Sequence, residues 1–137
     1  MFAIPARALV SKELANLLNA LSHPHRIRII EELRGRELDV NSLQSILGIS
    51  HSAVSQNLAI LRSHRLVHER REGRRVIYSL SDNALAEWLT AGLRFLEADL
   101  GDVRSAVATV RTMWSEPLSP HAVNGNGEPL SETGGDD

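Results

Sequence analysis

The stretch between residues 42 and 64 constrains the fold of this 137-residue chain more than any other part of its sequence. A short helical segment, Ser42–Leu47, is stopped by Gly48, and Ser50 is a typical N-cap for a longer helix that runs to about His64. Apolar residues of the longer helix recur at helical spacing, at Val54, Leu58 and Leu61. Two helices joined by so short a turn predict a helix-turn-helix.

Two further helices are predicted upstream of this motif. Ser11 is the expected N-cap of the first, which runs to about Leu21. Pro24 suits the first turn of the second, whose apolar stripe is Ile27, Ile30 and Leu33, and Gly35 ends it. Asp39 or Asn41 is the expected cap of the short helix that follows.

A two-stranded hairpin is predicted directly after the motif. Val67, Val76, Ile77 and Tyr78 favour strands over residues 66–71 and 75–80, and residues 71–74 form the hairpin tip. The fold class expected from this order of elements is mainly α with a small β-hairpin, a winged helix-turn-helix.

A long apolar seam follows the hairpin. Asp82 or Asn83 is expected to cap a last helix, in which leucines and valines recur every three or four residues from Leu85 to Val110. Gly101 is the expected point for a break or kink, which leaves a second helix over about residues 102–114. A seam this long exceeds the needs of a small core and predicts a partner helix. The dimerisation residues predicted in this seam are Leu85, Leu89, Leu93, Leu96 and Leu100.

Charge is distributed unevenly along the chain. All 15 Lys and Arg lie in residues 1–114 with 12 of the 17 acids, a net charge of +3, whereas five acids and no base lie beyond Trp114. The last stretch is also rich in Pro, Gly, Ser and Asn, a composition typical of disorder. We therefore predict an arm over residues 1–10, one winged helix-turn-helix domain with C-terminal dimerisation helices over 11–114, and a disordered acidic tail over 115–137.

The chain has no cysteine, which excludes disulfides and thiolate metal sites and fits a reducing compartment. Residues 1–10 make a poor signal peptide, and no stretch approaches the roughly 20 apolar residues that a membrane span needs. The expected location is the cytoplasm, with no membrane partner.

Polar and basic residues of the motif indicate contact with double-stranded DNA. A helix-turn-helix places the N-terminal end of its second helix in the major groove, where His51, Ser52, Ser55, Gln56 and Asn57 are expected to be exposed. Six arginines between residues 62 and 75 surround the hairpin, where they can hold phosphates. A solvated polar face would give a similar pattern, but the position of the arginines on the hairpin favours DNA.

The chain resembles the ArsR/SmtB family of winged-helix repressors over about residues 17–96. Three stretches carry the resemblance: HPHRIRII, ISHSAVSQNLAILR and REGRRVIYSL. It implies a homodimer built on the first and last helices, with Leu14 and Leu17 of the first helix among the dimerisation residues, an inverted-repeat operator, and repression relieved by an effector. It also implies base contacts from His51, Ser52, Ser55 and Gln56, and wing contacts from Arg71, Arg74 and Arg75; Ser50 and Arg62 complete the predicted DNA-binding set.

The metal sites of the family do not match this sequence. Where many members have a Cys-x-Cys pair, this chain has Asp39 and Asn41. At the other site of the family, Asp82 matches one of four ligands, and the remaining positions are Ala84, Phe95 and Ala98. We therefore predict no metal and no cofactor, and interpret Asp82 as a helix cap.

Other sensing sites remain open. His23, His25, His64 and His68 could form a non-standard metal site, although exposed histidines beside DNA more often contact phosphate or water. Trp88, Phe95 and Trp114 could line a pocket for an apolar ligand, but packing of a dimer core explains them more simply.

The functional prediction is a sequence-specific DNA-binding transcriptional regulator, a repressor that binds an inverted-repeat operator as a homodimer. The alternatives are a winged-helix module that binds another protein, and a metal-responsive repressor with a histidine site. An enzyme is not expected, because no phosphate loop, metal triad or nucleophile motif is present in the sequence. The effector is unknown.

Overall fold

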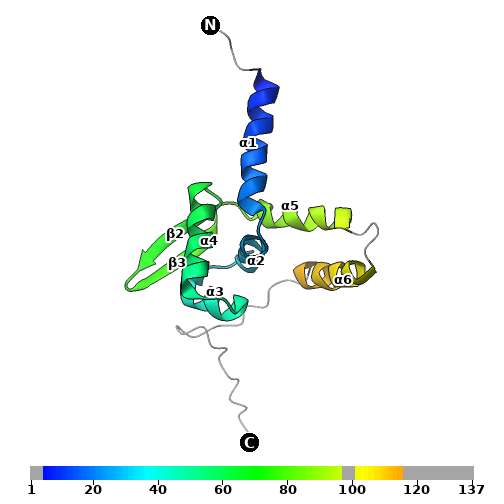
Figure 1. Ribbon diagram of the computed structural model, residues 1–137. Helices are drawn as coiled ribbons and strands as arrows, with labels where there is room; N and C mark the ends of the chain where they lie inside the picture. The colour runs from blue at the N-terminus through cyan, green and yellow to red at the C-terminus, as the bar shows by residue number, and fades with distance from the viewer. Residues whose placement is uncertain (1–4, 97–100, 116–137) are drawn as a thin grey trace, which may run out of the picture. The chain divides into compact units, whose positions relative to one another are not determined.

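A computed structural model describes residues 5–96 and 101–115 of the chain. The chain divides into two compact units, Met1–Gly92 and Leu93–Asp137, each of which is described by itself. In the described part of the first unit, the helices are α1 (Ala6–Leu21), α2 (Pro24–Glu32), α3 (Val40–Leu47), α4 (His51–Ser63) and α5 (Ala84–Gly92) (Figure 1). None of the helices within the described ranges combines the length and apolar character needed to cross a membrane.

Helix α1 begins six residues earlier than the sequence predicts. It starts at Ala6, after Pro5 at the N-cap position, so residues 6–10 belong to the helix and not to an arm. Ser11 lies inside the helix and does not cap it. The prediction failed because serine is a preferred N-cap residue wherever it occurs, and Ser11 therefore indicates a helix start in the sequence. The residues between Pro5 and Ser11 also permit helix, so the helix starts earlier. Figure 1 shows α1 extending away from the other elements of its unit.

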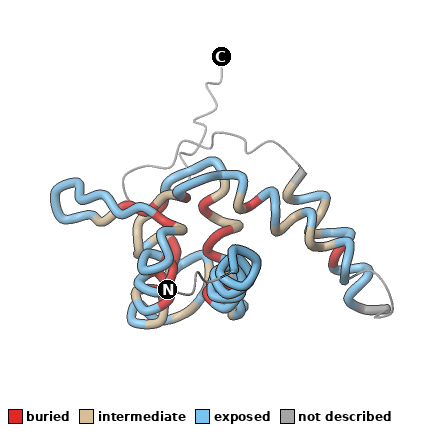
Figure 2. Tube along the Cα trace, turned by 90° about the horizontal axis from the view of Figure 1, so that it is seen from above, coloured by how far each residue is buried: buried red, intermediate tan, exposed pale blue. Residues whose placement is uncertain are grey.

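The three-stranded sheet contains the predicted hairpin and one strand that the sequence did not predict. Strands β2 (Val67–Glu72) and β3 (Arg75–Leu80) pair antiparallel, and the two-residue strand β1 (Leu38–Asp39) pairs with the other edge of β3. Glu72 faces Arg75 in the register, so the hairpin loop is only Gly73-Arg74. Gly73 has φ 63°, a backbone conformation that favours glycine. Most of the hairpin is exposed (Figure 2).

The hydrophobic core of the first unit joins α2, α3, α4 and the sheet. Its largest fully buried side chains are Ile29, Ile30, Leu33, Leu43, Val54, Leu58, Leu61 and, from the sheet, Val67. The predicted stripe of α4 is therefore confirmed. The predicted stripe of α2 is partly wrong, because Ile27 is 36% exposed and Ile29 takes the buried position.

The helix-turn-helix formed by α3 and α4 is held by the predicted caps. Asp39 is the N-cap of α3, and its Oδ1 accepts a hydrogen bond from the backbone N–H of Ser42 at 2.8 Å. Gly48 ends α3 in the left-handed conformation, with φ 65°. Ser50 caps α4, and its Oγ accepts from the N–H of Ala53 at 3.1 Å. These caps fix where each helix starts and stops.

The C-terminal seam is shorter than predicted before it breaks. Helix α5 ends at Gly92, and the second unit begins with a 3-10 helix, η1 (Leu93–Leu96). Residues 97–100, including the predicted dimerisation residue Leu100, lie outside the described residues. Helix α6 (Gly101–Ser115) agrees with the second helix expected after the break, and packs against η1. Residues 116–137 of the predicted tail also lie outside the described residues.

Candidate nucleic-acid interface

The N-terminal turns of α4 present the predicted base-reading side chains. Ser50, His51, Ser52 and Gln56 are exposed, and Ser55 is half-buried. The opposite side of the same helix is anchored in the core by Val54 and Leu58. Helix α4 therefore offers hydroxyl, imidazole and carboxamide groups from a rigidly packed element, which suits hydrogen bonding to base edges.

Asn57 does not belong to this exposed set. The sequence analysis expected it to be exposed, but only 8% of the residue is accessible. Its Nδ2 donates to the carbonyl of Ala53 at 2.8 Å, and its Oδ1 accepts from Arg26 at 3.2 Å. Asn57 lies on the buried side of α4 because it follows Val54 by three residues and precedes Leu61 by four, the spacing that places side chains on one helix face.

The six arginines between residues 62 and 75 fall into two groups. Arg62, Arg70 and Arg75 form ion pairs with carboxylates. Arg65, Arg71 and Arg74 are exposed and have no ion pair with any residue that the structure describes. Only the second group has its whole guanidinium charge uncompensated by a neighbouring carboxylate.

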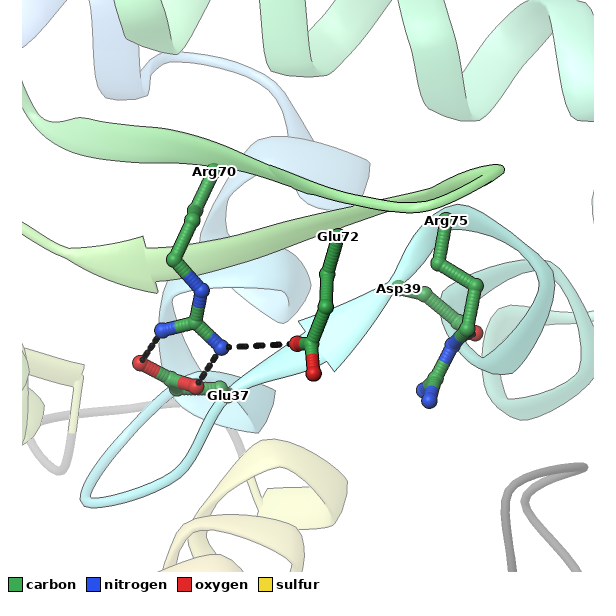
Figure 3. A network of polar contacts seen from close by, with 5 residues as sticks. All are labelled: Glu37, Asp39, Arg70, Glu72 and Arg75. Atoms are coloured by element: carbon green, nitrogen blue, oxygen red, sulfur yellow. Dashed lines mark hydrogen bonds and ion pairs between the residues drawn. The ribbon is translucent and has the colours of Figure 1, made fainter.

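Arg70 is the most strongly paired of these cations. Its Nη1 and Nη2 donate to the two carboxylate oxygens of Glu37, each at 2.9 Å, and Nη2 also donates to Glu72 at 3.3 Å. Figure 3 shows the guanidinium of Arg70 facing both carboxylates. The hydrogen bonds to Glu37 and then to Glu72 raise the pKa of Arg70. This bidentate geometry ties β2 to the segment that precedes β1.

Asp39 connects the wing, which is the hairpin of β2 and β3, to the helix-turn-helix. While Oδ1 caps α3, Oδ2 accepts from Nε of Arg75 on β3 at 3.1 Å. The Asp39 side chain is only 12% exposed. Burial alone would raise the pKa of Asp39, but the hydrogen bonds from Ser42 and the guanidinium of Arg75 outweigh burial and lower that pKa below its ordinary value of 3.8.

A third contact joins the end of α4 to the sheet. Nη1 of Arg62 donates to Oε2 of Glu69 at 2.7 Å, and the hydroxyl of Tyr78 donates to the same oxygen at 2.9 Å. Burial, followed by the contact with Glu69, raises the pKa of Tyr78. The sequence does not identify Glu37 and Glu69 as partners of the arginines, because Glu37 lies 33 residues from Arg70 and Glu69 lies on a different element from Arg62.

Arg65 has an unusual backbone conformation. It follows α4 with φ 59°, the only positive φ of a non-glycine residue in the described ranges. The N–H of Leu66 bonds to the carbonyl of Leu61 at 3.0 Å, and the N–H of Arg65 bonds to Arg62 at 2.9 Å. This is the Schellman arrangement in which glycine is preferred. Because arginine and not glycine occupies position 65, this helix end carries no glycine that would mark it in the sequence.

The histidines do not form a metal site with other ligands in the described structure. His23 caps α2, with its Nδ1 accepting from the N–H of His25 at 3.1 Å, and the two rings lie 4.9 Å apart. His64 and His68 are exposed. Across residues 5–96 and 101–115, no group of three or more histidines and carboxylates is arranged to hold a metal ion.

The remaining predicted positions lie on the C-terminal helices and on α1. Asp82 Oδ1 accepts from the N–H of Ala84 at 2.8 Å, the capping role that the sequence predicts. Leu14 is 50% exposed, whereas Leu17, Leu85, Leu89 and Leu93 are half-buried. Leu96, Trp88 and Phe95 are exposed. The described structure therefore leaves apolar side chains accessible on α1, α5 and η1.

Residues 23–69 match the family model described as bacterial regulatory protein, arsR family. A transcriptional repressor SmtB homolog of Synechocystis sp. is 47% identical over 73 residues, which are 53% of this chain and 55% of that protein. This chain thus matches about half the length of that relative. The HTH-type transcriptional regulator NmtR of Mycobacterium tuberculosis is 38% identical over 85 residues, which are 62% of this chain and 71% of NmtR.

The fold is also similar to that of solved regulators. The crystal structure of NolR from Sinorhizobium fredii superposes with a TM-score of 0.61 at 30% identity, and the match covers 72% of this chain and 99% of NolR. The winged helix-turn-helix fold that the sequence predicts is confirmed by this similarity and by the elements described above.

Proposed function

This chain belongs to the arsR family of bacterial regulatory proteins, and we propose that it is a sequence-specific DNA-binding repressor that acts as a homodimer on an inverted-repeat operator. One observation supports this function most directly. The exposed polar end of α4 lies in the same unit as a projecting hairpin that carries Arg71 and Arg74, whose charges no described carboxylate neutralises. Hydrogen-bonding groups for base edges and cations for phosphates are the two contact classes that DNA recognition combines.

Helix α4 is the proposed reading element. His51, Ser52, Ser55 and Gln56 would face base edges in the major groove, and Ser50 would hold the start of the helix at the DNA backbone. Gln56 has the side chain best suited to a bidentate contact with adenine. The packing of Val54, Leu58 and Leu61 in the core supports this role, because it keeps the helix from turning about its axis.

Arg71 and Arg74 are the proposed main phosphate contacts of the wing. Arg62 and Arg75 each donate one hydrogen bond to a carboxylate, from Nη1 and Nε respectively. Their other N–H groups remain available for phosphate. We propose that these two arginines contribute oriented hydrogen bonds to phosphate more than long-range electrostatic attraction. Their carboxylate partners, Glu69 and Asp39, cancel much of the attraction between each guanidinium and the DNA.

The proposed dimer uses the apolar stripes of α1 and the C-terminal helices. On α1, Leu9, Val10, Leu14 and Leu18 are each about half exposed or more, at 47–56%. An isolated helix with such a stripe is stabilised by packing against a partner. Two copies would place two α4 helices on successive major grooves, which requires an inverted repeat.

We further propose that the protein is not an enzyme, holds no resident metal or cofactor, and works in the cytoplasm. The absence of cysteine and the mismatch at the metal positions of the family support the second point. The capping role of Asp82 also gives that carboxylate a local function without a metal.

The function can be tested by selecting binding sites from a library of randomised duplex DNA with the purified full-length chain. We expect an enriched inverted repeat, bound by two chains for each duplex in analytical ultracentrifugation. Enrichment of no sequence would contradict the proposed repressor, and a single half-site bound by one chain would contradict the proposed dimer. Addition of Zn²⁺ or Ni²⁺ should not release the DNA; release that depends on His23, His25, His64 or His68 would favour a histidine site instead.

A further inference from the structure

We propose that Arg26 is a positioning residue for DNA reading: it fixes the recognition helix α4 against the C-terminal end of α1 and so sets sequence discrimination without contacting DNA. The proposal rests on the function proposed above for α4. Arg26 lies on α2, outside the predicted interface, and no role was assigned to it from the sequence.

The guanidinium of Arg26 joins two helices other than its own. Its Nε donates to the carbonyl of Ala20 at 2.5 Å, and its Nη1 donates to Oδ1 of Asn57 at 3.2 Å. Ala20 lies in the last turn of α1, where the carbonyls have no partner within the helix. Arg26 satisfies one of these carbonyls with a charged donor, at the end of the helix that favours a positive charge.

Asn57 is the counterpart of Arg26 on α4. Among the described residues, it is the only polar or charged one in the buried class. Both ends of its carboxamide are used, since Oδ1 accepts from Arg26 and Nδ2 donates to the carbonyl of Ala53. The side chain therefore has one orientation in which both polar atoms are satisfied. A turn of α4 about its axis strains the bond to Arg26, whereas the bond to Ala53 lies within α4 and moves with it.

The position of Asn57 makes this restraint relevant to base reading. It directly follows Gln56 and lies two residues after Ser55, so a rotation of α4 at Asn57 displaces both proposed base contacts. Hydrogen bonds to base edges depend on geometry, whereas attraction between cations and phosphates tolerates small displacements. Loss of the restraint is thus expected to reduce discrimination between DNA sequences and to leave non-specific affinity intact.

The contact with Ala20 extends the restraint to α1. Ala20 and Leu21 are the buried residues of α1, while most of the helix is exposed. The direction of α1 relative to α4 is therefore fixed near its C-terminal end, where Arg26 binds. If α1 forms the dimer contact, the same guanidinium sets the separation of the two α4 helices, and hence the preferred spacing of half-sites.

The test compares Arg26→Gln, Asn57→Ala and the double variant with Arg28→Gln as a matched control. Arg28 lies on the same helix but is exposed and pairs with Glu31 and Glu32. Affinity is measured at 25 °C for the duplex selected by the wild-type chain and for a random duplex of equal length. We expect each single variant to lose on the order of tenfold in the ratio of the two affinities. The double variant should lose no more than either single variant, because the Arg26–Asn57 hydrogen bond is already lost in each single variant.

Thermal unfolding and hydrogen exchange without DNA separate positioning from folding. If Arg26 only stabilised the fold, the melting temperature would fall while the ratio of affinities at 25 °C stayed unchanged, and that result would overturn the proposal. Additive losses in the double variant would also overturn it. Should a variant unfold, Arg26→Lys, which keeps the charge but cannot reach both acceptors, takes its place.

Hydrogen exchange also distinguishes failure of this inference from failure of the proposed function. We expect Arg26→Gln to speed exchange of the backbone amides in both the middle of α4 and the last turn of α1, with no effect of Arg28→Gln. If the wild-type chain selects no DNA while this exchange pattern is observed, the proposed repressor function is wrong, but the link that Arg26 makes between α1 and α4 is supported. If exchange is unchanged in α4, the link itself is wrong.

Discussion

At the scale of single residues, the arginines near the wing differ in the partners of their guanidinium groups. Arg74 has no ion pair among the described residues, whereas Arg70 is held by Glu37 and Glu72. A cation already paired with two carboxylates releases few counterions when it approaches a phosphate. The predicted DNA-binding set combines Arg62 and Arg75, which are paired with carboxylates, with Arg71 and Arg74, which have no ion pair among the described residues, and only the tertiary contacts distinguish them.

We predict that Arg74→Ala will flatten the dependence of DNA affinity on salt. Each lost phosphate contact makes the negative slope of log K against log salt less steep by about 0.9, and a dimer loses two such contacts. Arg70→Ala is the matched control on the same hairpin and should leave the slope nearly unchanged. Fluorescence anisotropy at several salt concentrations measures both. Equal changes for the two variants would contradict the division into paired and unpaired arginines.

The pairing of Asp39 predicts how stability depends on pH. Because the pKa of Asp39 is lowered below 3.8 in the folded chain, its ionised form stabilises the fold above the pKa of the unfolded state. This contribution is lost as the pH falls through the lowered folded pKa. Asp39→Asn keeps a good N-cap but cannot titrate. The difference in unfolding free energy between wild type and variant should shrink from pH 6 to pH 2.5; a constant difference would show that the charge of Asp39 contributes nothing.

At the scale of elements, caps and periodicity allowed most helices to be predicted. Asp39, Gly48 and Ser50 cap their helices as the sequence predicts. Such caps are predictable because each one bonds to backbone groups only a few residues away in the sequence. Strand β1 was not predicted, since two residues carry no pattern and Leu38–Asp39 becomes a strand only by pairing with Ile77 and Tyr78. The buried side of α2 was misassigned because Ile27, Ile29 and Ile30 are all apolar, and tertiary packing decides which of them is exposed.

The turn of the helix-turn-helix yields a prediction about backbone conformation. A methyl group at Gly48 would meet no atom within 4 Å, but its φ of 65° is unfavourable for alanine. Gly48→Ala should therefore lower the free energy of unfolding by about 1–2 kcal/mol. Gly92→Ala is the control, since it also has open space and no positive φ, and it should not destabilise the chain. Urea denaturation measures both; equal stabilities of the two variants would refute a backbone origin.

At the scale of the whole molecule, the proposed dimer makes the apolar stripe of α1 testable. Leu14 is 50% exposed, so Leu14→Glu should leave the fold of a single chain intact while placing a charge in the dimer contact. We expect sedimentation equilibrium to show a monomer and the affinity for the selected duplex to fall. Lys12→Glu, an exposed position on another side of α1, controls for charge and should remain dimeric. A dimeric Leu14→Glu chain would place the contact elsewhere.

The central claim is that this chain recognises a DNA sequence, and the most direct measurement is its affinity for the selected duplex and for a random duplex at increasing salt. The account predicts that both affinities fall steeply with salt, because phosphate contacts are shared. The selected duplex should be bound about 10³-fold or more tightly than the random one at each concentration, because base contacts from α4 differ between them. Equal affinities at every salt concentration would contradict the account.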